Sequence, residues 1–247
     1  MESLKANILN EVQKLFSRKK TWIFLIIIAI TSFLSAFFIT AIQTKLVFIA
    51  MSSISFPLMA LSIFTNIILP LFIFMAVSEL FAGEVEDKTL KLVLIMPITR
   101  LKVYITKIIS IGIYIIINLF VVLLVSTISA LFLNINLSSI SNVICSYLID
   151  VIPALILAIF ASFIAQFFRS SSTALTSCIL IFIGIKVISL FFPGINSNIF
   201  TNYLNWSSLW FSGETNFLRA INIFLLMVAY GIIFFTTGYY MFDKKEV

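Results

Sequence analysis

Histidine is absent from the 247-residue sequence, and glycine is scarce. Without histidine the chain cannot contain an HExxH metal site or a Ser-His-Asp triad. Its seven glycines never form the GxxxxGK(S/T) or GxGxxG patterns that cradle phosphates. The sequence therefore predicts no catalytic residue, no metal site and no bound cofactor, and any nucleotide chemistry must come from another chain.

Charged residues are also scarce, at 11% of the chain, whereas 62% of the residues are hydrophobic. A soluble domain has about 25% charged and about 45–50% apolar residues. The apolar residues form long uninterrupted runs, such as Ile26–Ile28 and Ile115–Ile117, instead of the alternating pattern of an outer-membrane barrel. The chain is therefore expected to be an all-α membrane protein.

Six segments are long and apolar enough to be membrane spans, because a bilayer core of about 30 Å requires about 20 helical residues. Together they form a single transmembrane domain over residues 1–247. The stretch 193–218 is too polar to span and is rich in aromatic residues, which favours an extracellular re-entrant or interfacial segment; an aromatic belt before the last span is the alternative. The expected spans are 22–42, 56–80, 105–132, 145–168, 173–192 and 219–241.

The basic residues are distributed unevenly between the two sides of these spans. Thirteen of the sixteen fall on one side, in the N-terminal segment, between spans two and three, between spans four and five, and in the C-terminal tail. The positive-inside rule places that side, with both termini, in the cytoplasm. The net charge of +6 then reflects topology and anionic lipid headgroups, so no nucleic-acid partner is expected.

The first twenty residues carry Leu4, Ile8, Val12 and Leu15 at helical spacing, with charged residues on the other faces. This pattern predicts an amphipathic helix over residues 1–20 that lies on the inner headgroups. An ordinary basic anchor for the first span is the alternative.

Residues 81–104, between spans two and three, include three acids followed by a short apolar stretch from Leu90 to Met96 that ends at Pro97. Acids before a helix and a proline after it fit the rules for helix starts and stops. Leu90 and Val93 would share one face of a short cytoplasmic helix. A solvated loop that leads into span three is the alternative.

The run Glu84–Leu90, followed by Met96–Arg100 and Lys107, resembles a known pattern. ABC-2 type permeases have a similar acidic-Thr-Leu segment, Pro-(Ile/Val)-(Ser/Thr)-Arg stretch and later lysine. Residues Glu11–Lys19 resemble the amphipathic entry of that family. The family commonly has glycine before the threonine, where this chain has Lys88. The likeness is confined to the N-terminal part of the chain, and beyond it only the number of spans agrees.

The resemblance implies the permease subunit of an ATP-binding-cassette exporter, with a short coupling helix that docks into a cytoplasmic ATPase. The implied partners are an ATPase dimer, which would bind ATP and Mg, a second permease, identical or related, and membrane lipid. The implied location is the cell membrane, as a multi-pass protein of a bacterial inner membrane. The implied coupling residues are Glu84, Glu86, Asp87, Thr89, Leu90, Val93, Pro97 and Arg100.

Three ionisable residues are candidates for a role inside the apolar region, where a charge costs on the order of 3 kcal/mol. Asp150 and Lys186 are expected at equal depth on consecutive spans. They would either form a structural ion pair or line an outward-facing cavity that contacts the substrate. Glu79, at the inner end of span two, is expected to reach toward Lys88 or Lys91.

The sequence favours export of an amphipathic compound, because the spans offer apolar and small polar side chains but few charges. A peptide antibiotic, a drug or a lipid-linked molecule would fit, and similar permeases serve in antibiotic resistance. The alternative is a secondary transporter driven by an ion gradient, with Asp150 as its coupling carboxylate. An intramembrane enzyme is not expected, because Asp150 has no second acid at its depth.

Overall fold

The computed structural model describes residues 2–45, 56–90, 99–132, 140–211 and 217–245, and this part of the chain is helical without any strand. The all-α class predicted from the sequence is therefore confirmed. The α-helices are α1 (Glu2–Ser17), α2 (Lys19–Lys45), α3 (Phe56–Ile63), α4 (Leu69–Ser78), α5 (Glu84–Glu86), α7 (Arg100–Phe132), α8 (Ile140–Ile149), α9 (Val151–Ala165), α10 (Ser171–Phe191), α11 (Ser207–Phe211) and α12 (Phe217–Asp243). Two π-helical segments, η1 (Phe64–Ile68) and η2 (Glu79–Gly83), and two 3-10 segments, η3 (Pro193–Asn198) and η4 (Phe200–Tyr203), complete the described elements.

Five helical stretches are long and apolar enough to cross a membrane, and each corresponds to one of the predicted spans. They are Phe56–Glu86, Arg100–Phe132, Ile140–Ala165, Ser171–Phe191 and Leu218–Asp243. The segment predicted as the first span, 22–42, lies within α2. The chain is therefore a multi-pass membrane protein.

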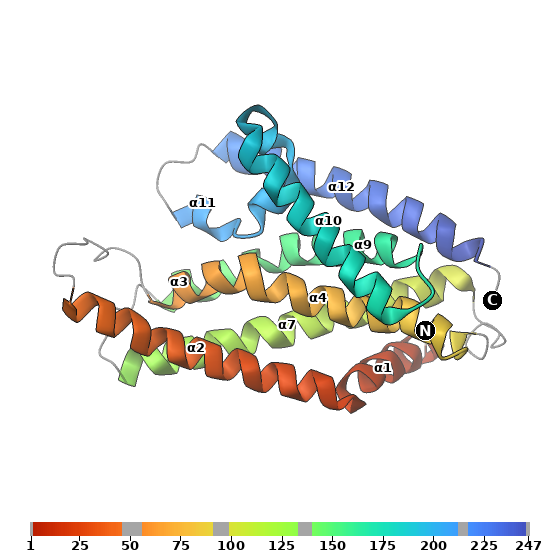
Figure 1. Cartoon of the computed structure of the whole chain (residues 1–247), viewed down its shortest axis with the longest axis horizontal. Helices are drawn as coiled ribbons and strands as arrows, with labels where there is room; N and C mark the ends of the chain where they lie inside the picture. Colours follow the sequence, from red (N-terminus) through yellow and green to blue (C-terminus); the bar gives the residue numbers. More distant parts are fainter. Residues whose placement is uncertain (1, 46–55, 91–98, 133–139, 212–216, 246–247) are drawn as a thin grey trace.

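The long helices run lengthwise beside one another, and α1 lies across one end of the bundle (Figure 1). Both ends of the described chain are found at this same end, which we call the terminal end. Helix α7 packs against α1, α2, α3 and α9, while α9 also contacts α4 and α12. Every residue of helix α4 except Leu71 is buried, so this helix forms the centre of the core.

The second of the predicted spans is longer than expected and is interrupted twice by π-helical turns, η1 and η2. It continues to Glu86, so the acids at 84 and 86 belong to its last turns and not to a separate cytoplasmic helix. A π-turn inserts one extra residue into the helix and is frequent at functional sites. Segment η2 takes part in the polar contacts of the terminal end through the Glu79 carboxylate and the Leu80 carbonyl.

Tyr104 joins three helices at the terminal end. Its ring is completely buried, and its hydroxyl lies 2.9 Å from Ser162 Oγ of α9. The rings of Phe81, Phe235 and Phe242 pack around it, with centroids 5.3 to 5.6 Å away. Helix α12 can approach this ring only because a glycine faces it.

That glycine is Gly238, and its replacement by alanine is expected to destabilise the fold. A Cβ atom there would lie 2.5 Å from Tyr104 Oη and 3.4 Å from Phe163 Cα. Overpacking of this kind costs about 1–3 kcal/mol. The gain in helix propensity is at most about 1 kcal/mol. Thermal unfolding of the purified protein in detergent should therefore show a lower midpoint for Gly238→Ala.

Gly184 provides the matched control, because no atom of the described chain lies within 4 Å of a Cβ added there. Gly184→Ala should keep or raise the midpoint, through propensity alone. Equal midpoints for the two variants would mean that the Tyr104 contact does not limit the packing of α12.

Candidate functional site

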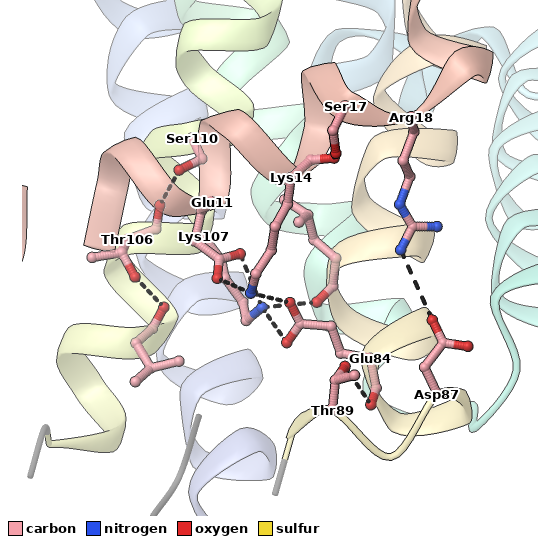
Figure 2. Close-up of polar contacts among 12 residues, drawn as sticks. Glu11, Lys14, Ser17, Arg18, Glu84, Asp87, Thr89, Thr106, Lys107 and Ser110 are labelled. Atoms are coloured by element: carbon pink, nitrogen blue, oxygen red, sulfur yellow. Dashed lines mark hydrogen bonds and ion pairs between the residues drawn. The ribbon is translucent and has the colours of Figure 1, made fainter. Parts of the chain in front are cut away.

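Four charged side chains meet inside the terminal end of the bundle (Figure 2). Lys107 of α7 donates to Glu11 Oε2 of α1 at 3.2 Å and to the Leu80 carbonyl of η2 at 3.0 Å. Its Nζ also lies 2.7 Å from Glu84 Oε2, an ion pair without hydrogen-bond geometry. Lys14 of α1 donates to Glu11 Oε1 at 2.7 Å and to Glu84 Oε1 at 3.1 Å. We call Glu11, Lys14, Glu84 and Lys107 the four-charge cluster.

Three members of the four-charge cluster are buried, the side chain of Lys14 is 36% exposed, and the four formal charges sum to zero. Lys107 is 0% exposed, Glu11 5% and Glu84 4%. Burial alone would favour the neutral carboxyl of Glu11, but the charges of Lys107 and Lys14 outweigh it and lower the pKa of Glu11. Burial likewise opposes the charged form of Lys14, yet Glu11 and Glu84 raise its pKa overall. Each charge therefore depends on the others, and together they join α1, the end of span two, and α7.

A second group of charges lies beside the first, where α1 meets α2. Glu79 is 4% exposed and accepts a hydrogen bond from Lys20 Nζ at 3.2 Å, while Arg18 lies 3.6 Å away. Of the two expected partners of Glu79, Lys88 is not in contact with it, and Lys91 lies outside the described residues. The N-terminal helices supply the cations that contact Glu79. Arg18 also approaches Asp87, at 4.0 Å. The end of span two is thus bound to both N-terminal helices.

Glu86 faces a different neighbour from Glu84. Its two carboxylate oxygens accept hydrogen bonds from the Ser171 backbone N–H at 2.8 Å and from Ser170 Oγ at 3.2 Å. Both donors stand at the N-terminus of α10. Glu84 and Glu86, two residues apart, therefore bind opposite sides of the bundle.

The other predicted coupling residues divide between the interior and the surface. Leu90 is 2% exposed, so it packs inside this chain and cannot form the expected docking face. Thr89 Oγ1 donates to the Glu84 carbonyl at 3.4 Å, and Arg100 donates to the Asp243 carbonyl at the end of α12. Val93 and Pro97, and with them the predicted helix, lie outside the described residues.

Lys88 is the residue that stands where related permeases commonly have glycine. Its φ of 57° is in the left-handed region, where glycine meets no steric cost and other residues do. The turn after α5 thus needs a backbone conformation that suits glycine, and this chain adopts it with a lysine.

Asp150 and Lys186 do not meet: among the described residues each has a different partner. The Asp150 carboxylate is 0% exposed and accepts hydrogen bonds from Ser207, from the backbone N–H at 2.8 Å and from Oγ at 2.9 Å. Lys186 Nζ donates to the Thr201 carbonyl at 2.7 Å. Equal depth did not produce the expected ion pair, because a folded-back segment lies between the two side chains and satisfies both.

That segment, residues 193–211, is folded against the bundle at the end opposite the termini. Trp206 stacks on Phe224 of α12, with ring centroids 6.0 Å apart, and Phe200 packs on Phe160 of α9 at 5.4 Å. Tyr230 of α12 donates to the Asn198 carbonyl at 3.1 Å. The segment therefore contacts α9, α10 and α12, and we call it the opposite-end segment.

Sequence reasoning missed three members of the four-charge cluster as site residues. Lys107 was quoted as the later lysine of the family pattern but was given no role, although a lysine inside the predicted third span is itself a signal for one. Glu11 and Lys14 stand three residues apart on the N-terminal helix, a spacing that puts them on one face. No group of three metal-ligating residues occurs in the described part of the chain.

Loss of Lys107 is expected to be strongly destabilising. Lys107→Met leaves two buried carboxylates with only Lys14, and breaking a buried ion pair in this way costs about 3–5 kcal/mol. The double variant Lys107→Met/Glu84→Gln should recover part of this loss, because it leaves the balanced Glu11–Lys14 pair. Lys102→Met, on the exposed side of the same helix, is the control. Equal thermal midpoints for Lys107→Met and Lys102→Met would contradict the arrangement.

The contacts of Asp150 and Lys186 also make a prediction about charge reversal. Asp150→Lys should lower the yield of folded protein, since it places a cation against the Ser207 N–H. Lys186→Asp in the same chain should not restore that yield, because the two side chains bind separate parts of the opposite-end segment. Size-exclusion profiles of the single and double variants would measure it. Full recovery in the double variant would show that the two charges do meet.

One known family matches the chain. Residues 7–187, almost three quarters of the sequence, match the family described as ABC-2 family transporter protein. A comparison with curated proteins found no match. The matched region includes the whole four-charge cluster, Glu86 and both Asp150 and Lys186. Members of this family are membrane components of ABC transporters, without catalytic activity of their own, and work with an ABC ATPase partner. The chain therefore belongs to the ABC-2 family, as the membrane permease of an ABC transporter.

Proposed function

We propose that this permease exports an amphipathic compound, using ATP and Mg bound by a separate ATPase dimer. The observation that carries the proposal is the four-charge cluster. It binds the end of span two to α1 and α7, so the segment that ends span two is joined to several helices at once. A partner that pushes on that segment would therefore move the bundle and not merely bend a loop.

The proposed topology has six spans with both termini in the cytoplasm. Helix α2, the first span along the chain, is added to the five helical stretches given above. At 1.5 Å per residue, the 27 residues of α2 extend about 40 Å, enough to cross a bilayer. No charged residue occurs between Lys20 and Lys45. The exposed side of α2 carries Trp22 and Ile26, each 57% exposed, as a lipid-facing helix would.

We place α1 on the inner membrane surface. Glu11 and Leu15 face the bundle, whereas Leu9 on the other side is 68% exposed. A helix with one side bound to protein and an apolar residue on the other suits the interface between headgroups and acyl chains. The positive-inside rule puts this end of the molecule in the cytoplasm. The membrane is proposed to be a bacterial inner membrane.

The ATPase contact is assigned to the segment after Glu86, which includes Val93 and Pro97. We call Glu84–Leu90 the coupling motif. Its acids contribute to the ATPase contact indirectly, since Glu84 and Glu86 bind other helices of this chain. Exposed Asp87 and Lys88 stand at the corner where the segment leaves the bundle. The coupling motif thus provides a joint on its inner side and a docking face beyond it.

The cargo class follows from the walls that the bundle offers. A groove of about 400 Å³ between α9 and α12 is lined by residues such as Leu155, Ile159 and Ile232, and one of about 420 Å³ between α2 and α7 by Phe33, Ile128 and others. Apolar walls suit an amphipathic peptide, drug or lipid-linked molecule, as in antibiotic resistance. Six helices make a small shell, so a second permease, identical or related, would complete the path.

A secondary transporter driven by an ion gradient fits the structure less well. Its coupling carboxylate would be Asp150, and both oxygens of that side chain are already occupied by Ser207. An ion would have to displace the opposite-end segment to reach it.

The experiment is co-purification of the tagged permease with its ATPase from the native membrane. Val93→Asp should abolish co-purification, since it places a charge on the proposed docking face, while the permease still inserts into the membrane. Ser197→Asp, exposed in the opposite-end segment, is the control and should retain the ATPase. Leu90→Asp is unsuitable, because Leu90 is buried and its loss would unfold the chain.

An ATPase that stays bound to Val93→Asp would overturn the docking assignment. Purification of the unmodified permease without any ATPase would overturn the proposed function itself.

A further inference from the structure

Helix α10 is loosely packed along its length but is held at both ends by polar contacts. Only 17% of the apolar stretch that would cross the membrane in α10 is buried, compared with 67% of that in the span Phe56–Glu86. Its contacts along the bundle are few and include the Phe182 ring against Phe74, 5.5 Å between centroids, and Cys178 Sγ near the Ala161 carbonyl at 3.9 Å. A helix with so little buried surface can shift against its neighbours at small cost.

At the terminal end α10 is held by a residue of the coupling motif. Glu86 accepts hydrogen bonds from the Ser171 N–H and from Ser170 Oγ. The Ser170 hydroxyl also lies 3.1 Å from Ser172 Oγ, but it caps no backbone N–H of α10 in the described structure. Gly83 lies close beside the helix start, because a Cβ there would be 3.6 Å from Ser171 Cβ. Glu86 therefore acts as the N-cap acceptor that Ser170 does not provide, and its charge suits the helix dipole.

At the other end α10 holds the opposite-end segment. Lys186 Nζ donates to the Thr201 carbonyl at 2.7 Å, and Ser189 Oγ donates to Asn196 Oδ1 at 2.6 Å. Asn202 Nδ2 donates in turn to Ser189 Oγ at 2.8 Å. Three polar contacts from two adjacent turns of α10 thus join this segment to the helix. Movement of the helix is passed to the segment through these contacts and works against the bonds between Ser207 and Asp150.

We infer that α10 transmits movement of the coupling motif to the opposite-end segment, and that Glu86 is the positioning residue through which the movement enters. Helix α10 extends about 30 Å at helical rise, so a displacement at one end is carried to the other. Glu86 follows Glu84 by two residues and shares its turn, yet it binds α10 while Glu84 binds α1 and α7. The inference depends on the proposed function, since the ATPase supplies the movement.

The Glu86 contact is tested on the permease alone in lipid nanodiscs, by hydrogen exchange at the start of α10. Glu86→Ala should raise the exchange rate at Ser171 about tenfold, because the backbone N–H loses its acceptor. Glu86→Gln, which retains one acceptor oxygen, should raise it less. Thr176→Ala is the control on the same helix, because that hydroxyl bonds only to carbonyls of its own helix. An unchanged rate in Glu86→Ala would overturn the contact.

Transmission is tested on the complex with the ATPase that co-purifies. The rate at which a thiol-reactive fluorophore labels Ser197→Cys, in a chain with Cys145→Ala and Cys178→Ala, reports how accessible the opposite-end segment is. ATP should change the labelling rate in the parent complex and in Thr176→Ala. With Glu86→Ala the ATPase should remain bound and hydrolyse ATP, while the ATP-dependent change falls at least fivefold.

Each other outcome is decisive. A full ATP-dependent change in Glu86→Ala would overturn the inference, and so would loss of the ATPase from that variant, which would make Glu86 a docking residue. If Glu86→Ala and Lys186→Met both show the same ATP-dependent change in labelling rate as the parent complex, α10 carries no signal. Absence of any ATPase from the parent purification would defeat the proposed function and the transmission step, while the exchange measurement would still decide the contact.

Discussion

A charge inside an apolar bundle is stable only where an opposite charge or a polar group meets it, and this constraint organises both ends of the molecule. Lys107 is completely buried and depends on Glu11 and Glu84. Removal of α1 from the bundle would strip Glu11 and Lys14 from the cluster, so that Lys107 and Glu84 would each lose one of their two charged partners. The N-terminal helix is thus an integral part of the permease fold and not an independent anchor.

Five of the six predicted spans correspond to long apolar helices of the described chain, because hydropathy measures what the bilayer requires. The sequence did not predict the partners of the charges inside them. Helical rise places Asp150 and Lys186 at equal depth, but depth says nothing about direction around a helix or about a third segment between them. The opposite-end segment, whose backbone and hydroxyl groups satisfy both residues, was predicted as re-entrant or interfacial without its contacts. Charge partners therefore had to come from the fold.

The coupling motif illustrates the same limit at the other end. Its acidic-Thr-Leu pattern marks the segment that we propose for coupling, but the π-turn η2 adds a residue just before it and changes the direction of the helical side chains that follow. Successive helical residues differ by about 100°, so Glu84 and Glu86 reach opposite neighbours. Leu90, expected on a docking face, follows the left-handed turn at Lys88 and is buried in the core.

Glu84 and Glu86 differ in what they can contribute to transport. Glu84 is inside and fixes the end of span two to α1 and α7, which are themselves packed together. Glu86 is at the surface and holds α10, the described span with the least buried surface together with the last one. Displacement of the motif would meet high resistance through Glu84 and low resistance through Glu86. A push too weak to deform the core could therefore still shift α10, and the asymmetry of packing selects the helix that moves.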